Sequence, residues 1–478
     1  MFQLINQILL QFTNCFKREA TRRWFVVLVL GFMMRGNHRG ITSTISDMRL
    51  KPEKYHCMLN FFRSDAYEVD DLYKHWIGIV MERGDDILRI SGRVVMLGDH
   101  IKIGKEGRRM PDIQILHQES ENACKGEFIA GHTFAQISAV ITNGKVSRSL
   151  PLITEPQKSP PKIPGTNKPD GDTLVVQMLK LGAKAAEYAN LDDPAIIALD
   201  AYFSKSTAFA VSKIKLAASG KPLIRIVTRA QDSYTGYMPV EQKLDPSPGR
   251  PRKYGEKIKL KELFNDMSTF EETTLTLYGK ETKVKYQCLD LLWKPLGETI
   301  RFVAVEMDRG RCVLMTDDFT LTPEEIITIY CLRFKIETSF DEQKNDLGCF
   351  SYRFWTMSLD KRSRRKANVT QDDEAQKVIA AKKAIASFVC LGTLASGILT
   401  IIAFSHNREI WKRYPGWIRT LRADVPSASV SREALSHGFH ALLRQFPSLD
   451  VSNIVTLFLR DSDYLYSYLD FSDFNNAA

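Results

Sequence analysis

The sequence predicts an α/β protein with helical regions at both ends of the chain. Apolar residues recur at helical spacing before residue 90, apolar strands alternate with helical patterns over 91–230, and strands of alternating polarity dominate 231–315. We therefore expect a helical N-terminal region, the first part of an α/β core, a β-rich insertion, the second part of the core and a helical C-terminal region. The expected boundaries are 1–90, 91–230, 231–315, 316–408 and 409–478.

Composition limits the kind of partner and compartment. A chain of 478 residues, 44% of them hydrophobic, is long enough for two or three buried cores. The net charge of +10 suits a polyanion such as nucleic acid, although many basic proteins bind none. The eight cysteines include no Cys-x-x-Cys pair and no cysteine–histidine cluster. This pattern favours a reducing, cytoplasmic compartment and argues against a zinc site.

Two apolar stretches have some features of membrane segments. Trp24–Met34 is too short to span a bilayer, and no small-residue cleavage site follows it, so we expect no signal peptide. Residues 384–404 carry no charge over a length that would span a bilayer, but they are rich in Ser, Thr, Ala and Gly. We expect a buried core helix there, with a membrane span as the alternative.

The core begins with an apolar run that ends in a carboxylate. Val94–Leu97 is followed by Gly98 and Asp99, a pattern typical of a buried central strand. Two further strands are expected at 134–141 and 146–154, joined by an Asn143-Gly144 turn. The first three strands should therefore form a meander.

A helix capped by Asp172 comes next, followed by a second apolar strand that ends in a carboxylate, Asp200. A helix reaching Ala218 and a strand at 222–227 complete the series. This order matches the ribonuclease H fold, which places the ends of its first and fourth strands side by side. Asp99 and Asp200 would then be neighbours, although an Asp at a strand end is more often a turn or helix cap.

Residues 322–344 predict a helix with a clear start. Thr322 as N-cap, Pro323 at the first position and Glu325 three residues after the cap form a capping box. An apolar stripe would bury one side of this helix. Its members are Ile329, Leu332, Ile336, Phe340 and Leu347.

A polar edge lies beside this stripe. At about 100° per residue, four residues fall within an arc of roughly 60°: Tyr330, Arg333, Glu337 and Lys344. One interpretation is an amphipathic helix with ordinary solvated ion pairs. The spacing also resembles the tyrosine-arginine-glutamate-lysine signature of bacterial insertion-sequence transposases of the IS4 type.

The resemblance covers residues 91–405 and implies a catalytic triad of two aspartates and one glutamate, here Asp99, Asp200 and Glu337. It implies Mg²⁺ as cofactor, replaceable by Mn²⁺, with two ions per site. Asp99 would be shared by both ions, Asp200 would bind one ion and Glu337 the other. Such hard cations prefer carboxylate oxygens. A pair of them about 3.5–4 Å apart stabilises both the attacking and the leaving oxygen of a cleaved phosphodiester.

The resemblance also implies DNA contacts. Arg333 and Lys344 would hold the DNA backbone beside the cut, Arg333 bidentately, and Tyr330 would contact a phosphate or a base. The β-rich insertion is likewise a family feature, and a tryptophan there can hold a flipped base. Trp293 would take that role or else pack the insertion.

Basic runs and the chain ends leave alternatives open. Lys361–Lys366, which includes Arg364 and Arg365, would contact phosphates or be simply solvated. Residues 1–90 would bind DNA ends or form a structural helical cap.

We therefore expect a cut-and-paste DNA transposase that cleaves at element ends and transfers the strands into target DNA. Its partners would be double-stranded DNA with terminal inverted repeats and target DNA. A homodimer would bind them in the cytoplasm, at the nucleoid, without membrane contact. The alternatives are a related metal-dependent endonuclease without strand transfer and a catalytically inactive, transposase-derived DNA-binding protein.

Overall fold

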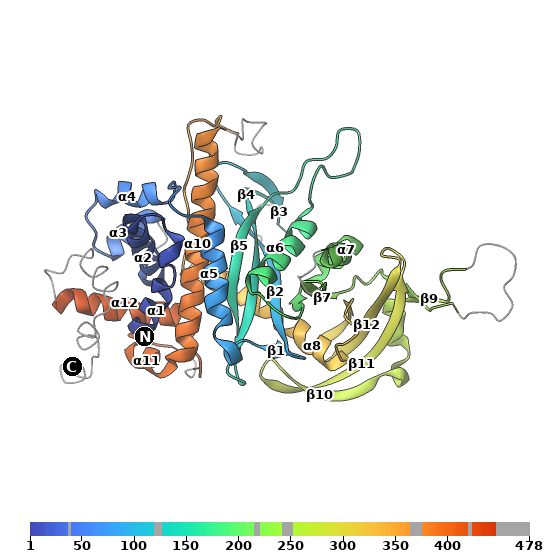
Figure 1. The fold of residues 1–478 in the computed structure, drawn as a ribbon. Coiled ribbons are helices and arrows are strands. Elements are labelled where there is room, and N and C mark those ends of the chain that lie inside the picture. The colour runs from blue at the N-terminus through green and yellow to red at the C-terminus, as the bar shows by residue number, and fades with distance from the viewer. Residues whose placement is uncertain are drawn as a thin grey trace.

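The computed structural model describes residues 1–36, 40–118, 127–214, 220–240, 252–363, 375–418 and 423–445. The described strands form one large mixed sheet, so the predicted α/β class is confirmed (Figure 1). Helices from both ends of the chain gather beside one end of this sheet, and the β-rich segment lies at the other.

Five strands form the part of the sheet that carries the carboxylates, in the order β5-β4-β2-β6-β7. The pairs β2–β4 and β4–β5 are antiparallel, whereas β2–β6 and β6–β7 are parallel. The strands in this part of the sheet, with the short edge strands, are β1 Arg89–Ile90, β2 Arg93–Gly104, β3 Gln114–His117, β4 Phe128–Thr142, β5 Ser147–Gln157, β6 Ala195–Ala198 and β7 Ile224–Arg229. The predicted meander is confirmed, with Gly144 in the turn at a φ of 83°.

The β-rich segment extends the same sheet. Strand β13 pairs antiparallel with β7, and β12, β11, β8 and β9 follow in that order. The bounds are β8 Thr235–Tyr237, β9 Lys257–Lys259, β10 Glu271–Leu277, β11 Lys280–Trp293, β12 Glu298–Met307 and β13 Gly310–Thr316. Tyr278 and Gly279 join β10 to β11 in a hairpin, with positive φ angles of 54° and 77°.

Helices cover both faces of the sheet. Alternate residues of β2 point to opposite faces, with Met96 in one apolar cluster and Val95 and Leu97 in the other. Helices α6 (Leu174–Tyr188) and α7 (Ser206–Ile214) cover the Met96 face. Helix α8 (Pro323–Leu332), helix α9 (Phe334–Asp341) and a π-helical turn (Glu342–Asp346) follow one another across the other face.

Two sequence expectations about helices need correction. The N-cap of α6 is Thr173, whose hydroxyl accepts from the Val176 N–H, while Asp172 pairs with Lys180 on the helix surface. The helix expected over 322–344 is divided at Arg333 and ends in the π-helical turn. Lys344 lies in this π-helical turn, where the α-helical spacing that predicted the polar edge no longer applies.

The terminal helices pack together beside one end of the sheet (Figure 1). They are α1 Phe2–Leu10, α2 Glu19–Met34, α3 Ile41–Asp47, α4 Lys54–Phe61, α5 Val69–Met81, α10 Gln376–Ser405, α11 Asn407–Arg413 and α12 Ala428–Gln445. From α5, the Trp76 indole donates to the Pro151 carbonyl of β5 at 2.8 Å. The described part of residues 1–90 is thus largely helical, as expected, apart from β1, and it packs directly on the sheet. The expected boundary at residue 409 falls inside α11.

Helix α10 confirms the interpretation of 384–404 as a core helix. It is long and apolar enough to cross a membrane, but 94% of its most apolar window is buried inside the protein. Neighbours on both sides explain this burial, since Phe388 packs against Phe32 of α2 and Gly397 lies under the Trp76 ring. The apolar surface of α10 is therefore used for packing among helices.

Two helical glycines give a matched test of this packing. A Cβ on Gly397 would lie 2.2 Å from Cζ2 of Trp76, whereas a Cβ on Gly78 would meet nothing within 4 Å. Gly397→Ala should lower the free energy of unfolding by about 1–3 kcal/mol, because a full core cannot take the methyl group. Gly78→Ala should raise it by about 0.5–1 kcal/mol through helix propensity. Urea unfolding measures both, and equal effects would contradict this packing.

Candidate active site

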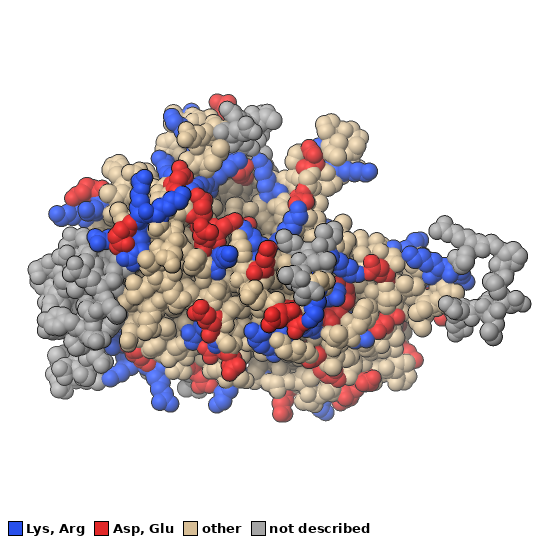
Figure 2. Space-filling view, in the orientation of Figure 1, with Lys and Arg blue, Asp and Glu red and all other residues tan. Residues whose placement is uncertain are grey.

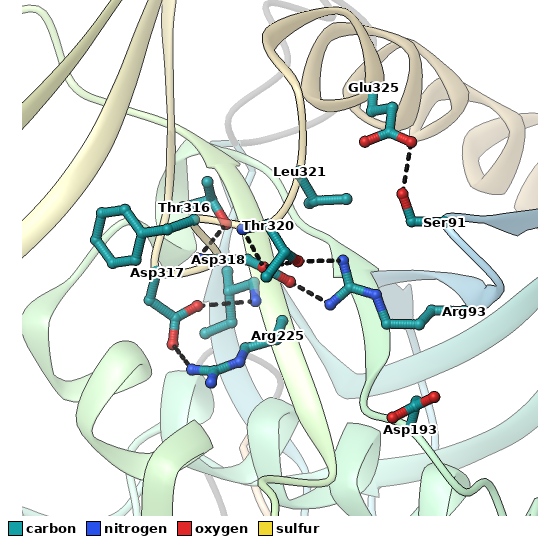
Figure 3. A network of polar contacts seen from close by, with 12 residues as sticks. Ser91, Arg93, Asp193, Arg225, Thr316, Asp317, Asp318, Thr320, Leu321 and Glu325 are labelled. Carbon is teal, nitrogen blue, oxygen red and sulfur yellow. Dashed lines mark hydrogen bonds and ion pairs between the residues drawn. The ribbon is translucent and has the colours of Figure 1, made fainter.

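A network of polar contacts around two buried aspartates fixes the start of α8 (Figure 3). Arg93 of β2 forms an ion pair with Asp318 and donates to the Thr320 hydroxyl at 3.2 Å. On β7, which is separated from β2 by β6, Arg225 donates to Asp317 at 3.0 Å. Asp317 and Asp318 are buried, so these partners are needed to compensate their charges. The segment between β13 and α8 is thereby tied to the sheet.

The predicted capping box then begins the helix. The Glu325 N–H donates to the Thr322 hydroxyl at 3.2 Å, and the Thr322 N–H donates to the Glu325 carboxylate at 2.9 Å. Glu325 also accepts from Ser91 at 2.6 Å, as Figure 3 shows. The first turn is therefore held both by its own cap and by the residue just before β2.

From this anchor the helix crosses the sheet toward the carboxylates. Helix α8 packs on β6 and β7, and α9 packs on β2 and β5. Arg93 contacts Thr320 at one end, and Arg333 contacts Asp99 at the other. These contacts tie the segment 320–333 to β2 at two separate points.

A buried arginine holds the far end of the helix. Arg35, just after α2, is fully buried and donates to the carbonyls of Leu347 and Gly348. These carbonyls follow the π-helical turn, where a helix leaves acceptors without internal partners. The N-terminal region thus caps the helix that carries Glu337.

Asp99 and Asp200 lie at equivalent positions of neighbouring parallel strands. Leu97 pairs with Ala198 in the register of β2 and β6, and each aspartate follows two residues later. One oxygen of Asp200 accepts from the Tyr202 N–H at 2.9 Å and caps the short 3-10 turn Ala201–Phe203. Asp200 therefore has the turn-capping role that is common at strand ends and also lies beside Asp99.

Arg333 joins Asp99 to Glu337. Its guanidinium donates to Asp99 Oδ2 at 3.3 Å and to Glu337 Oε1 at 2.5 Å. The side chains of Arg333 and Asp99 are each 18% exposed, whereas that of Glu337 is 44% exposed. The three predicted triad residues thus come together from β2, β6 and α9, with an arginine between two of them.

This cluster holds three carboxylates, Asp99, Asp200 and Glu337, and one arginine, Arg333, contacts two of them. Burial raises the pKa of Asp99 to about 7, and the charge of Asp200 adds to the increase. The His100 N–H, 2.7 Å from Asp99 Oδ1, and Arg333 oppose that rise. Burial alone would lower the pKa of Arg333, but the hydrogen bond to Glu337 and the charge of Asp99 raise it overall.

The other predicted DNA-binding residues lie in different environments. Tyr330 is half-buried, and burial raises its pKa to about 12, so it stays a neutral phenol. Lys344 is exposed on the π-helical turn. Trp293 is 2% exposed and packs against Tyr234 and Phe209, which favours its packing role over contact with a base.

The second basic run is only partly described. Arg364 and Arg365 lie outside the described residues. Arg362 of the same run is buried and donates to the carbonyls of Lys105 and Gly107, each at 3.2 Å. This arginine therefore has a structural role.

Asp99 and Asp200 could bind a hard cation as they stand, whereas Glu337 is already held by the shorter of the two hydrogen bonds that Arg333 donates to the cluster. A cation would relieve the repulsion that helps to raise the Asp99 pKa, and carboxylates are the ligands that Mg²⁺ prefers. However, the described residues contain no group of three or more His, Cys, Asp or Glu side chains arranged to hold a metal ion. Glu337 would become a third ligand only if its hydrogen bond to Arg333 were released.

Sequence reasoning missed the two features that position this site. Asp317 and Asp318 stand between a strand and a capped helix, and that placement is the one local signal for their anchoring role. The contact between Arg333 and Asp99 has no local signal, and the sequence led us to assign Arg333 to DNA.

Comparisons with known proteins identify no relative: no protein-family model matches the sequence, and no curated protein matches it significantly. The interpretation of this site therefore depends on residue spacing and on geometry.

The pKa of Asp99 gives a test without substrate. Because folding raises this pKa from about 4 to about 7, the folded state binds the proton more tightly than the unfolded chain does. Stability should therefore fall as pH rises through that window, and Asp99→Asn should remove this loss. We expect the unfolding free energy of Asp99→Asn, relative to wild type, to increase by at most about 4 kcal/mol between pH 4 and 7.

Chemical denaturation in buffer with a chelator makes this measurement. Asp193→Asn serves as the control, since a hydrogen bond with Lys221 lowers the pKa of that carboxyl and should give the opposite trend. A flat difference between Asp99→Asn and wild type would mean that Asp99 titrates normally.

Proposed function

We propose that this protein is a metal-dependent DNA-cleaving enzyme of the cut-and-paste transposase class, resembling the IS4 type, with a ribonuclease H-like core. The strand order β5-β4-β2-β6-β7, with three antiparallel and then two parallel strands, supports this core. In that interpretation β8 to β13 are the family's β-rich insertion, attached to the edge of the core at β7.

One observation carries the proposal. Asp99, Asp200 and Glu337 come from distant parts of the chain and gather where β6 ends beside β2, joined to each other through charge and through Arg333. These are the residues that the tyrosine-arginine-glutamate-lysine resemblance selects. A solvated amphipathic helix would have no reason to direct its arginine toward a buried strand aspartate.

The residues suit phosphodiester chemistry in the following way. When bound, Mg²⁺ would activate the attacking oxygen and stabilise the leaving one. Asp99 and Asp200 would hold it, with Glu337 joining once Arg333 turns from this carboxylate to a DNA phosphate. A guanidinium can exchange one partner for the other because carboxylate and phosphate present similar pairs of oxygens. Lys344 would add a point charge along the DNA backbone.

DNA with terminal inverted repeats, and target DNA, are the proposed partners, bound by a homodimer in the cytoplasm at the nucleoid. The net charge of +10 supports a polyanionic partner. On the face seen in Figure 2, basic and acidic side chains are interspersed. Any contiguous basic surface for DNA would therefore lie elsewhere.

A specific observation also favours a second candidate, an inactive, transposase-derived DNA-binding protein. Arg333 already forms ion pairs with Asp99 and Glu337, as a structural arginine would in a site that no longer binds metal. An endonuclease without strand transfer would use the same residues, so product analysis has to distinguish it from a transposase.

Crystals soaked in Mn²⁺, with anomalous scattering used to locate the ions, test the proposal directly. We expect manganese beside Asp99 and Asp200 in the wild type and its loss in Asp200→Asn. Glu337→Gln should keep DNA binding while abolishing divalent-dependent cleavage, because the amide removes a ligand charge but keeps the shape. Cleavage by Glu337→Gln at the wild-type rate would mean that Glu337 is not a catalytic residue. A site without manganese would favour the DNA-binding candidate.

Lys344 is tested by salt dependence. Lys344→Ala should weaken DNA binding and reduce the salt slope by about one, because one phosphate contact is lost. Lys180→Ala is the matched control, since Lys180 is an exposed lysine of α6 that pairs with Asp172. Titration of labelled duplex at several salt concentrations gives both slopes. Equal salt slopes for Lys344→Ala and the wild type would mean that Lys344 is a solvated surface residue without a phosphate contact.

A further inference from the structure

A second polar site lies on the other side of α9. A cavity of about 160 Å³ opens between the start of β5, α9 and α10. Lys335, Thr338 and Glu342 line it from the helix, and at 100° per residue they point roughly 150° away from Arg333 and Glu337. This cavity is therefore separate from the carboxylate cluster.

The cavity has more positive than negative charge. Arg148 and Lys335 face it with one carboxylate, Glu342. Arg148 Nη1 lies 3.7 Å from Glu342 Oε1, longer than a hydrogen bond, while its Nη2 donates to the Val425 carbonyl at 2.9 Å. Lys335 forms no ion pair or hydrogen bond with any other described residue, and burial and Arg148 both lower its pKa. One positive charge is thus left without a counterion.

The same cavity contains donors that lack acceptors. Ser149 is 5% exposed, and its hydroxyl has no hydrogen-bond partner within the described part of the chain. The same holds for Nε of Arg148. Buried donors without acceptors are uncommon and costly in folded proteins. A water molecule would satisfy these donors but would leave the unbalanced charge, whereas an anion would satisfy both.

We propose that this cavity binds a small tetrahedral oxyanion, with inorganic phosphate as the reference ligand. Arg148 and Lys335 would neutralise it, and the Ser149 hydroxyl and Arg148 Nε would donate to its oxygens. Cavities of about 150 Å³ admit a benzene-sized ligand, so the volume is sufficient. Glu342 does not prevent this, since Arg148 and Lys335 outnumber it, and burial raises the pKa of its carboxyl.

The proposed anion would also affect the first site. It would connect Arg148 of β5 to Lys335 of α9, and the same helix carries Glu337 on its opposite side. Binding at the cavity would therefore hold α9 against the sheet. The inference itself is independent of the nuclease proposal, because it needs neither DNA nor a metal ion.

Calorimetric titration of the full chain with inorganic phosphate, in chelator and at ionic strength fixed with chloride, tests the inference. We expect saturable binding and a rise of the melting temperature with phosphate concentration. Lys335→Met and Ser149→Ala should each weaken phosphate binding about tenfold, whereas Lys335→Arg should retain it. Lys180→Met, an exposed lysine of α6, should bind as the wild type does.

A second titration, with glycerol phosphate, distinguishes a site for the free phosphate ion from a site for phosphate esters. Binding of both ligands would mean that the mouth admits phosphate esters, and binding of inorganic phosphate alone would mean a site for the free ion. The absence of saturable binding of either ligand would overturn the inference. So would equal affinity of the wild type, Lys335→Met and Ser149→Ala, because phosphate would then bind elsewhere. Circular dichroism of each variant separates loss of binding from loss of folding.

Discussion

Strand β2 and the helix that crosses it are tied together at two points, and the candidate site depends on both. At the start of the strand, Arg93 pairs with Asp318 and reaches Thr320, which fixes where the helix begins. Farther along, Asp99 accepts from Arg333. A slip of one residue in either element would move the paired side chains to other faces. The ion pairs thus act with the apolar packing of Ile329 and Ile336 to set one register.

This register places charged groups on both sides of α9. Arg333 and Glu337 face the sheet carboxylates, and Lys335 faces the cavity beside Arg148. Between these two sides lies an apolar stripe whose members Ile336 and Phe340 are buried. Because the stripe keeps the helix from rotating, each polar side is held toward its own site. A short helix can therefore serve two separate polar environments.

The helices of the two chain ends support this arrangement from outside the sheet. Arg35 caps the end of the π-helical turn, and Trp76 donates to β5, so the N-terminal region contacts both the helix and the strand that bound the cavity. Helix α10 fills the space between them with its apolar surface. The terminal regions are therefore part of the framework of the site, whatever further contacts they make.

Much of the local structure was determined by the sequence alone. The capping box at Thr322, the turn at Asn143-Gly144, the buried strand before Asp99 and the apolar stripe of the helix depend on residues a few positions apart, so short patterns predict them. The tertiary structure decided the partners. Arg333 and Asp99 are 234 residues apart in the chain, and only the packing of α9 on β2 makes the guanidinium meet a carboxylate. Packing likewise buried Trp293 and α10, because burial depends on what surrounds a side chain, and no local pattern contains that information.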